Sequence, residues 1–190
     1  MVRASSLRHK ILGPVEGEQA CGDICSGRML EPDEIFVALE ACFFSLLEAE
    51  KVLITAGPTQ EPIDPVRYLS NHSSGKMGYA LAEAAEAAGA SVTLVSGPVN
   101  LRASSSIEVI DVVTAKDMFA EVKRSIEAAD IFIGCAAVAD YSPVNTHSQK
   151  IKKNLNENLL LELEPNPDIL KFVSENYSNK TIIGFSAETE

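Results

Sequence analysis

Residues 51–89 restrict the fold of this chain more than any other stretch. They begin with a short apolar run, residues 51–56, which predicts a buried parallel strand. A loop rich in Gly, Pro, Ser and Asn follows, and an alanine-rich helix then runs from Gly75 to about Ala88 before Gly89 ends it. A strand, a polar loop and a helix N-terminus in this order gather backbone N–H groups and the positive end of a helix dipole, which together can bind a phosphate.

The chain after this stretch continues to alternate between strands and helices. Further strands are expected in four short apolar runs: residues 91–95, 107–112, 131–136 and 181–185. Helices are expected at residues 115–128, where Thr114 and Asp117 give a capping signal, and from Pro167 to about Asn176. This order predicts an α/β protein with a Rossmann-like, three-layer, doubly wound and mostly parallel sheet, in which ligands bind beyond the carboxyl ends of the strands.

One segment late in the chain predicts a β-hairpin that protrudes from the sheet toward the site. Residues 150–153 and 159–164 have the pattern of two short strands, joined by residues 154–158. Three evenly spaced leucines would give the second strand a buried face: Leu159, Leu161 and Leu163.

The N-terminal part of the chain does not follow the alternating pattern. Residues 1–33 show no sustained periodicity, and residues 33–48 predict a helix whose apolar face must pack on the following domain or on a second subunit. We therefore divide the chain into residues 1–48 and a domain of residues 49–190. Because the chain stops at Glu190, directly after a predicted strand, we expect this domain to be truncated at its C-terminal end.

Composition narrows the class of protein. The 190 residues include 27 acidic and 16 basic side chains, so the net charge of −11 argues against nucleic-acid binding. The sequence contains no stretch of about 18 apolar residues, so we expect no membrane span. It also lacks the apolar core of a signal peptide, so we do not expect secretion. Four cysteines occur without a CxxC pair: Cys21, Cys25, Cys42 and Cys135. A cytoplasmic protein without a disulfide framework is the interpretation that these features favour.

Residues 70–78 are the strongest chemical candidate. Ser73 and Ser74 are placed to cap the helix, Gly75 allows close approach of a ligand, and Lys76 adds a positive charge. The stretch is neither a GxGxxG fingerprint nor a Walker loop, so an ordinary capped helix with a solvent-facing lysine is an equal alternative.

Other candidates lie in the loops that follow the predicted strands. Arg67 and Asn71 suit anion or amide contacts, although each alone is a common loop residue. Asp140 suits a metal ion or a ligand hydroxyl, or else caps local N–H groups. Cys135 has the surroundings of a packing residue. Lys150 belongs to a charge run that is solvated unless the hairpin covers the site.

Five motifs occur in order along the second domain. They read ITAGPTQEPIDPVRYLSNHSSGKMG, GCAAVADY, KIKK, NPDI and IGFSAET. With these motifs, residues 51–190 resemble bacterial phosphopantothenate–cysteine ligase, usually the C-terminal half of a fusion with phosphopantothenoylcysteine decarboxylase. The resemblance implies a homodimer and a Mg²⁺-dependent reaction of coenzyme A biosynthesis. In it the carboxylate of 4'-phosphopantothenate attacks CTP to give an acyl-cytidylate and pyrophosphate, and L-cysteine then displaces CMP to form an amide.

The resemblance also implies roles for individual residues. It assigns the nucleotide site to Gly134, Cys135, Ala136, Asp140, Lys150, Pro167, Asp168, Ile169, Leu170 and Phe185. Lys150 would contact the phosphates and assist activation. Asn71 and Arg67 would be needed to convert the acyl-cytidylate into product, with Asn71 contacting that intermediate. The substrate phosphate or the intermediate would lie near Gly57, Ser73, Ser74, Gly75, Lys76 and Ala137. The motifs do not identify metal ligands.

Residues 13–31 resemble the tail of the fused decarboxylase, including its substrate clamp. Cys21 matches the clamp cysteine that acts as an acid in that half. The FMN-binding core of the decarboxylase has no counterpart in this sequence, so we do not expect decarboxylation. We expect a ligase domain with impaired or lost turnover.

Two alternatives belong to other classes. One is a dimerising remnant that binds a nucleotide without catalysis. The other is a nicotinamide-dependent reductase, disfavoured because GxGxxG is missing and because Ser96, rather than an acidic residue, closes the second strand.

Overall fold

A computed structural model describes residues 15–18, 24–28, 30–43, 46–153 and 158–185. The chain forms two compact units, Met1–Leu46 and Leu47–Glu190, and each is described by itself. No helix among the described residues is long and apolar enough to cross a membrane.

The first unit contains a short antiparallel strand pair and one helix. The elements are β1 (Val15–Glu18), β2 (Ile24–Arg28) and α1 (Pro32–Phe43). The hairpin lies within residues 1–33, where the sequence shows no sustained periodicity. Helix α1 ends at Phe43 rather than at residue 48; residues 46–49 form a turn, and Ala49 has a left-handed backbone (φ 71°) that a helix cannot include.

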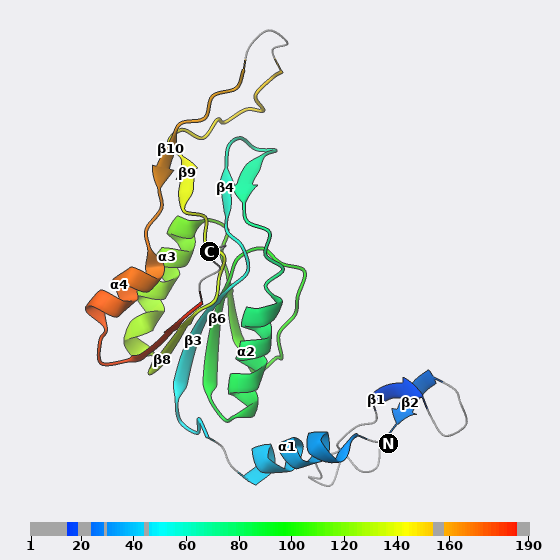
Figure 1. Cartoon of the computed structure of the whole chain (residues 1–190). Coiled ribbons are helices and arrows are strands. Elements are labelled where there is room, and N and C mark those ends of the chain that lie inside the picture. Colours follow the sequence, from blue (N-terminus) through cyan, green and yellow to red (C-terminus); the bar gives the residue numbers. More distant parts are fainter. Residues whose placement is uncertain (1–14, 19–23, 29, 44–45, 154–157, 186–190) are drawn as a thin grey trace, which may run out of the picture. The chain divides into compact units, whose positions relative to one another are not determined.

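The second unit is built on five parallel strands. They are β3 (Lys51–Ala56), β6 (Ser91–Ser96), β7 (Glu108–Asp111), β8 (Ile131–Gly134) and β11 (Thr181–Gly184). Their spatial order is β11-β8-β3-β6-β7, and every neighbouring pair is parallel (Figure 1). The predicted parallel sheet is confirmed, and each strand lies within two residues of its predicted bounds.

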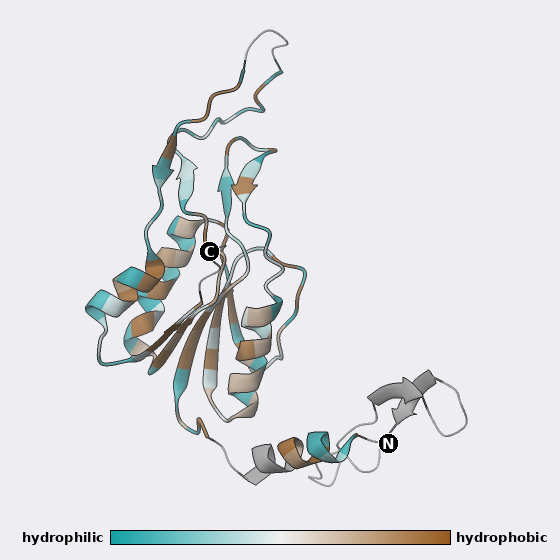
Figure 2. Cartoon of the chain, viewed as in Figure 1, coloured by the Kyte–Doolittle hydropathy of each residue, from teal (hydrophilic) through white to brown (hydrophobic). Residues whose placement is uncertain are grey.

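Helices cover both faces of this sheet. They are α2 (Lys76–Ala87), α3 (Ala115–Ser125), which a 3₁₀ turn (Ile126–Ala128) extends, and α4 (Ile169–Asn176). Alternate residues of β3 divide between the faces: Val52 and Ile54 pack with α2, whereas Leu53 packs with α3 and α4. Figure 2 shows the apolar strands between the helices. The predicted three-layer arrangement is confirmed.

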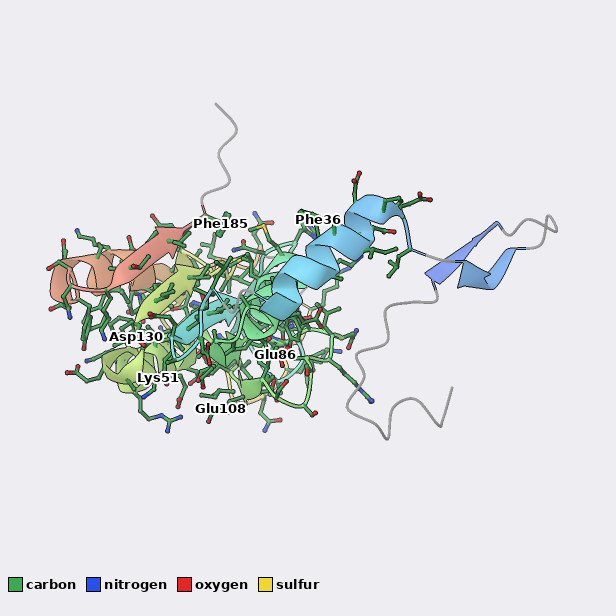
Figure 3. The ribbon with its side chains drawn as sticks, turned by 90° about the horizontal axis from the view of Figure 1, so that it is seen from below. Phe36, Lys51, Glu86, Glu108, Asp130 and Phe185 are labelled. Carbon is green, nitrogen blue, oxygen red and sulfur yellow. The ribbon has the colours of Figure 1, made fainter. Side chains whose placement is uncertain are left out.

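At the amino ends of the parallel strands, β3 and β8 begin side by side. Asp130 Oδ2 accepts a hydrogen bond from the Lys51 N–H (2.9 Å), and the Asp130 N–H donates to the Lys51 carbonyl (2.8 Å). Both residues are labelled in Figure 3. These bonds fix the register in which the two strands run toward the site.

The two predicted helix caps have different outcomes. The capping box of α3 is confirmed: the Thr114 N–H donates to Asp117 Oδ2 (3.0 Å), and the Asp117 N–H donates to Thr114 Oγ1 (3.1 Å). The prediction that Ser73 and Ser74 cap α2 is wrong. Gly75 is the N-cap residue, without a side-chain cap, because the chain enters α2 through a left-handed backbone (φ 73°).

Two short antiparallel pairs extend past the edge where the parallel strands end (Figure 1). They are β4 (Gln60–Pro62) with β5 (Tyr68–Ser70), and β9 (Tyr141–Pro143) with β10 (Leu163–Pro165). The first pair lies inside the loop after β3, which the sequence predicts to be irregular. Glu61 in β4 and Asp64 in the turn between the two strands are both buried.

The predicted hairpin exists, but its predicted strands are wrong. Residues 150–153 and 158–162 form no strand, and pairing occurs instead at β9 and β10, which a long excursion connects. Leu159 and Leu163 are 52% and 42% exposed, so the leucines do not share a buried face. A leucine alternation specifies a strand only where a second layer covers it, and here it has no such layer among the described residues.

Candidate functional site

The site lies where the connections of the sheet change direction. From β3 the chain moves through α2 to β6 and β7 on one side, and through α3 it then returns to β8 and β11 on the other. The carboxyl ends of β3 and β8 therefore diverge at a topological switch point, which is where open α/β sheets bind ligands.

A cavity of about 1020 Å³ opens at this switch point. Nine of the ten residues that the resemblance assigns to the nucleotide line it: Gly134, Cys135, Ala136, Asp140, Pro167, Asp168, Ile169, Leu170 and Phe185. Asn71 and Ala137 line it as well. The volume is at the upper end of the range for small-molecule sites and is sufficient for a nucleotide with a second substrate.

The cavity lining includes seven further residues, none of which the sequence analysis singled out. They are Thr55, His72, Met77, Phe132, Val138, Ala139 and Asn166. Most of them follow from neighbours that were predicted: Val138 and Ala139 lie between Ala137 and Asp140, and Asn166 opens the NPDI motif. Thr55 and Phe132 carry no such signal, because they lie within strands.

Two threonines, Thr55 in β3 and Thr59 in the loop after it, hold the loop after β8. Thr55 Oγ1 accepts hydrogen bonds from the N–H groups of Cys135 (3.2 Å) and Ala136 (3.3 Å), and Thr59 Oγ1 accepts from Ala139 N–H (2.9 Å). The Ala137 N–H donates to the Gly57 carbonyl (2.8 Å). These N–H groups are thus already paired within the protein, and the small residues of the loop line the cavity.

Asn71 completes this wall from a separate segment. Its Nδ2 donates to the carbonyl oxygens of Ala137 (3.2 Å) and Val138 (3.1 Å), while its side chain remains exposed to the cavity. The carboxamide oxygen is not used in these bonds. Asn71 therefore fixes the loop after β8 and still offers an acceptor to a bound molecule.

The opposite wall is apolar and depends on a glycine. A Cβ added at Gly184 would lie 2.4 Å from Leu170 Cδ2, so a larger residue would displace Leu170 from its place against β11. Leu170 is 39% exposed and Phe185, at the end of β11 (Figure 3), is 49% exposed. Partly exposed apolar side chains in a cavity suit the face of a planar base.

Polar groups concentrate at the β9–β10 end of the cavity. Asp168 Oδ1 accepts from the Lys171 N–H (2.9 Å) and caps α4. Asn166 Nδ2 donates to the Ala139 carbonyl (2.9 Å), whereas its buried Oδ1 has no hydrogen-bond partner among the described residues. The Asp140 carboxylate is exposed and forms no ion pair with any of the described residues.

The donor set bears on the expected Mg²⁺. No group of three or more His, Cys, Asp or Glu side chains within the described ranges is placed to hold a metal ion. Mg²⁺ more often binds through one or two carboxylates together with substrate phosphates. The exposed carboxylate of Asp140 at the cavity wall fits that mode of binding.

The two predicted cysteine sites differ. Burial raises the pKa of the Cys135 thiol, so it remains protonated at neutral pH, which agrees with the packing role predicted for it. Cys21 lies outside the described residues.

The glycine-rich start of α2 lies beside the cavity. Its flanking residues, His72 and Met77, line the cavity. Of the six residues assigned to the substrate phosphate or the intermediate, Ala137 lines the cavity and five do not: Gly57, Ser73, Ser74, Gly75 and Lys76. Gly57 and Gly75 approach each other closely and both have positive φ (75° and 73°). Their roles stay predictions.

Arg67 and Lys150 are also outside the cavity lining. The Arg67 guanidinium pairs with the buried Asp64 carboxylate, and its Nη2 donates to the Ile151 carbonyl (3.0 Å). Lys150, directly before Ile151, is exposed. The catalytic roles implied for both residues stay predictions.

Comparison with known proteins places the chain in a family. A family model described as "DNA/pantothenate metabolism flavoprotein C-terminal domain" matches residues 47–190. The chain belongs to this family. A flavoprotein-family domain thus makes up the second unit, and the resemblance to the C-terminal half of the bifunctional coenzyme A proteins is confirmed.

Relatives of this family domain are long bifunctional proteins. The chain is 51% identical over 181 residues to the "Coenzyme A biosynthesis bifunctional protein CoaBC" of Vibrio cholerae, covering 94% of the chain and 45% of the relative. It is 46% identical over 205 residues to that of Escherichia coli K12, covering 100% and 50%. The chain thus spans about half the length of the curated relatives it matches.

A solved structure supports the same placement. The crystal structure of the C-terminal domain of a CoaBC protein matches with a TM-score of 0.67 and 44% identity, over 76% of this chain and 68% of that one. The reductase alternative gains no support from the family domain's second strand. Ser96, which ends β6, is buried and hydrogen-bonded by the Tyr79 hydroxyl (3.1 Å).

Proposed function

We propose that the chain carries the phosphopantothenate–cysteine ligase domain of coenzyme A biosynthesis, with CTP as the activating nucleotide. The observation that carries this proposal is the convergence of nine predicted nucleotide residues, with Asn71, on one cavity at the switch point of the sheet. These residues come from four separate segments of the sequence, and only the fold brings them together. The family and its CoaBC relatives support the same activity.

In the proposed first step, a carboxylate oxygen of 4'-phosphopantothenate bonds to the α-phosphorus of CTP, and the bond to pyrophosphate breaks. Leu170 and Phe185 provide the apolar wall for the base, and the small residues after β8 let the substrate approach the backbone closely. Lys150 provides positive charge for the phosphates. Mg²⁺, when bound through Asp140 and the phosphates, would neutralise charge on the triphosphate.

In the second step, the amine of L-cysteine bonds to the acyl carbon, CMP leaves with the shared oxygen, and the nitrogen loses a proton. Asn71 contacts the acyl-cytidylate through its free carboxamide oxygen, while its Nδ2 keeps the wall of the cavity in place. We further propose that the active form is a homodimer. FMN belongs only to the decarboxylase half that other proteins of this kind carry.

Release of pyrophosphate tests the proposed function. We expect release from CTP only when 4'-phosphopantothenate and Mg²⁺ are both present. Asn71→Asp should retain this release but form no amide with cysteine, because a carboxylate facing the Ala137 and Val138 carbonyls repels them and distorts the wall that holds the intermediate.

Two results would count against the proposal. Equal pyrophosphate release without 4'-phosphopantothenate would reject the assigned reaction, and loss of release in Asn71→Asp would contradict the role given to that residue. Thermal stabilisation by CTP without any turnover would favour a nucleotide-binding remnant instead.

A further inference from the structure

Asp64, Arg67 and Ile151 form a group of contacts that the cavity does not include. We call these three residues the Asp64 clamp. Asp64 lies in the turn between β4 and β5 and is 3% exposed. Its Oδ1 accepts hydrogen bonds from the N–H groups of Val66 and Arg67 (both 2.9 Å). Its Oδ2 accepts from Arg67 Nε (3.0 Å), from Arg67 Nη2 and from the Ile151 N–H (3.0 Å).

The clamp holds both backbone groups of Ile151, a residue more than 80 positions away in sequence. Asp64 accepts from its N–H, and Arg67 Nη2 donates to its carbonyl oxygen at 3.0 Å. Two further bonds attach the same excursion to the β4–β5 pair: His147 N–H to the Ile63 carbonyl (2.9 Å), and Thr146 Oγ1 to the Pro62 carbonyl (3.2 Å). The excursion between β9 and β10 is thereby fixed along its first half.

The carboxylate of Asp64 is suited to this task. A buried charge is costly unless hydrogen bonds and an opposite charge compensate it, and both oxygens of Asp64 are fully used in this way. On the loop side, the residues next to Ile151 are exposed lysines: Lys150, Lys152 and Lys153. Within the described residues, the lysine segment therefore contacts the buried Asp64 carboxylate through the backbone N–H of Ile151.

We propose that the Asp64 clamp is a positioning device that holds the lysine segment, residues 150–153, in a fixed place against the turn between β4 and β5. Neither Asp64 nor Arg67 lines the cavity, so both act through Ile151 rather than by touching a substrate. Only the role given to Lys150 depends on the proposed function. If Lys150 has the role proposed for it in the first step, Arg67 supports that step by placing Lys150, although Arg67 itself lies outside the cavity lining.

Limited trypsin digestion of the full chain tests the clamp without any ligand. Cleavage after Lys150 requires the Lys150–Ile151 bond to enter the protease in extended form, and the Ile151 N–H must then leave Asp64. Asp64→Asn should raise the initial rate of this cleavage about fivefold or more. Cleavage after Arg102, an exposed residue of the loop after β6, should stay unchanged and serves as the internal reference.

A matched control removes a comparable ion pair elsewhere. Glu121→Gln breaks the pair with Arg124 on α3, which has the same three-residue spacing as Asp64 and Arg67. This variant should leave cleavage after Lys150 unchanged. Arg67→Lys, which keeps the charge but loses the two-pronged geometry, should give an intermediate rate. An unchanged ratio of Lys150 to Arg102 cleavage in both clamp variants would overturn the proposal.

Amide hydrogen exchange keeps the proposal testable if Asp64→Asn does not fold. In the unaltered chain the Ile151 N–H should exchange about tenfold more slowly than that of Lys152, for which the described residues supply no acceptor. Equal exchange at the two positions would contradict the clamp.

Kinetics then separates the clamp from the proposed function. Asp64→Asn and Arg67→Lys should lower kcat for pyrophosphate release with little change in KM for CTP. Combining Asp64→Asn with Lys150→Gln should cost no more than Lys150→Gln alone. If no form of the chain releases pyrophosphate while the digestion pattern still changes, the clamp stands and the proposed function fails. Fully additive losses would show that Asp64 does not act through Lys150.

Discussion

At the scale of residues, the motifs located the residues that line the site, but not the residues whose side chains hold its loops in place. The residues assigned to the nucleotide lie together because each follows a strand or opens α4, and such positions are readable from the sequence. Thr55, Thr59 and Asp64 were missed, although their side chains hold the loops in place. Their partners are 80 or more residues away, and no local pattern encodes such a contact.

Asp64 gives a pH prediction at this scale. The guanidinium of Arg67, together with backbone N–H donors, holds the pKa of the Asp64 carboxyl well below its usual range. A group whose pKa is lower in the folded chain stabilises it fully above the unfolded pKa, about 3.9, and loses this contribution as the pH falls further. The free-energy difference between the unaltered chain and Asp64→Asn should therefore be constant near pH 7 and shrink below about pH 4.

Urea unfolding at several pH values measures this difference. A difference that persists unchanged down to pH 3 would contradict the account, because the neutral carboxyl would then stabilise the fold as well as the carboxylate does.

At the scale of elements, the sequence predicted those whose signals are local. The capping box of α3 and the apolar run of β3 are complete within a few residues, and both are confirmed. The strands of the β9–β10 pair were misplaced, because short strands pair according to distant partners rather than their own alternation. Ser73 and Ser74 failed as caps because the chain enters α2 at Gly75 through a left-handed backbone, and α2 then approaches β3.

Gly78 shows how close that approach is. A Cβ added at Gly78 would lie 2.5 Å from the Ala56 Cβ and 3.1 Å from its Cα. Within a helix, Gly→Ala ordinarily stabilises by about 1 kcal/mol. Here we expect Gly78→Ala to destabilise by about 1–3 kcal/mol, because α2 must move away from the sheet.

Urea midpoints of Gly78→Ala and of Ala80→Gly, at an exposed position of the same helix, check this prediction. Ala80→Gly should cost no more than about 1 kcal/mol. A gain in stability from Gly78→Ala would show that α2 is not in contact with β3 at this point.

At the scale of the whole molecule, strand order decides where function is located. The alternation of strands and helices predicted a parallel sheet, and connection rules then placed all carboxyl ends at one edge. The sequence did not specify that β8 lies next to β3, yet this neighbourhood creates the switch point and its cavity. The central claim is that this cavity binds CTP.

Calorimetric titration of CTP in the presence of Mg²⁺ tests that claim most directly. Ala136→Phe places a large side chain in the cavity, whereas Ala80→Phe makes the same change on the exposed face of α2. Thermal unfolding should first confirm that both variants fold. The account predicts that CTP binds the unaltered chain and Ala80→Phe equally, and Ala136→Phe at least about tenfold more weakly, a loss of about 1.4 kcal/mol. Equal binding by all three proteins would contradict it.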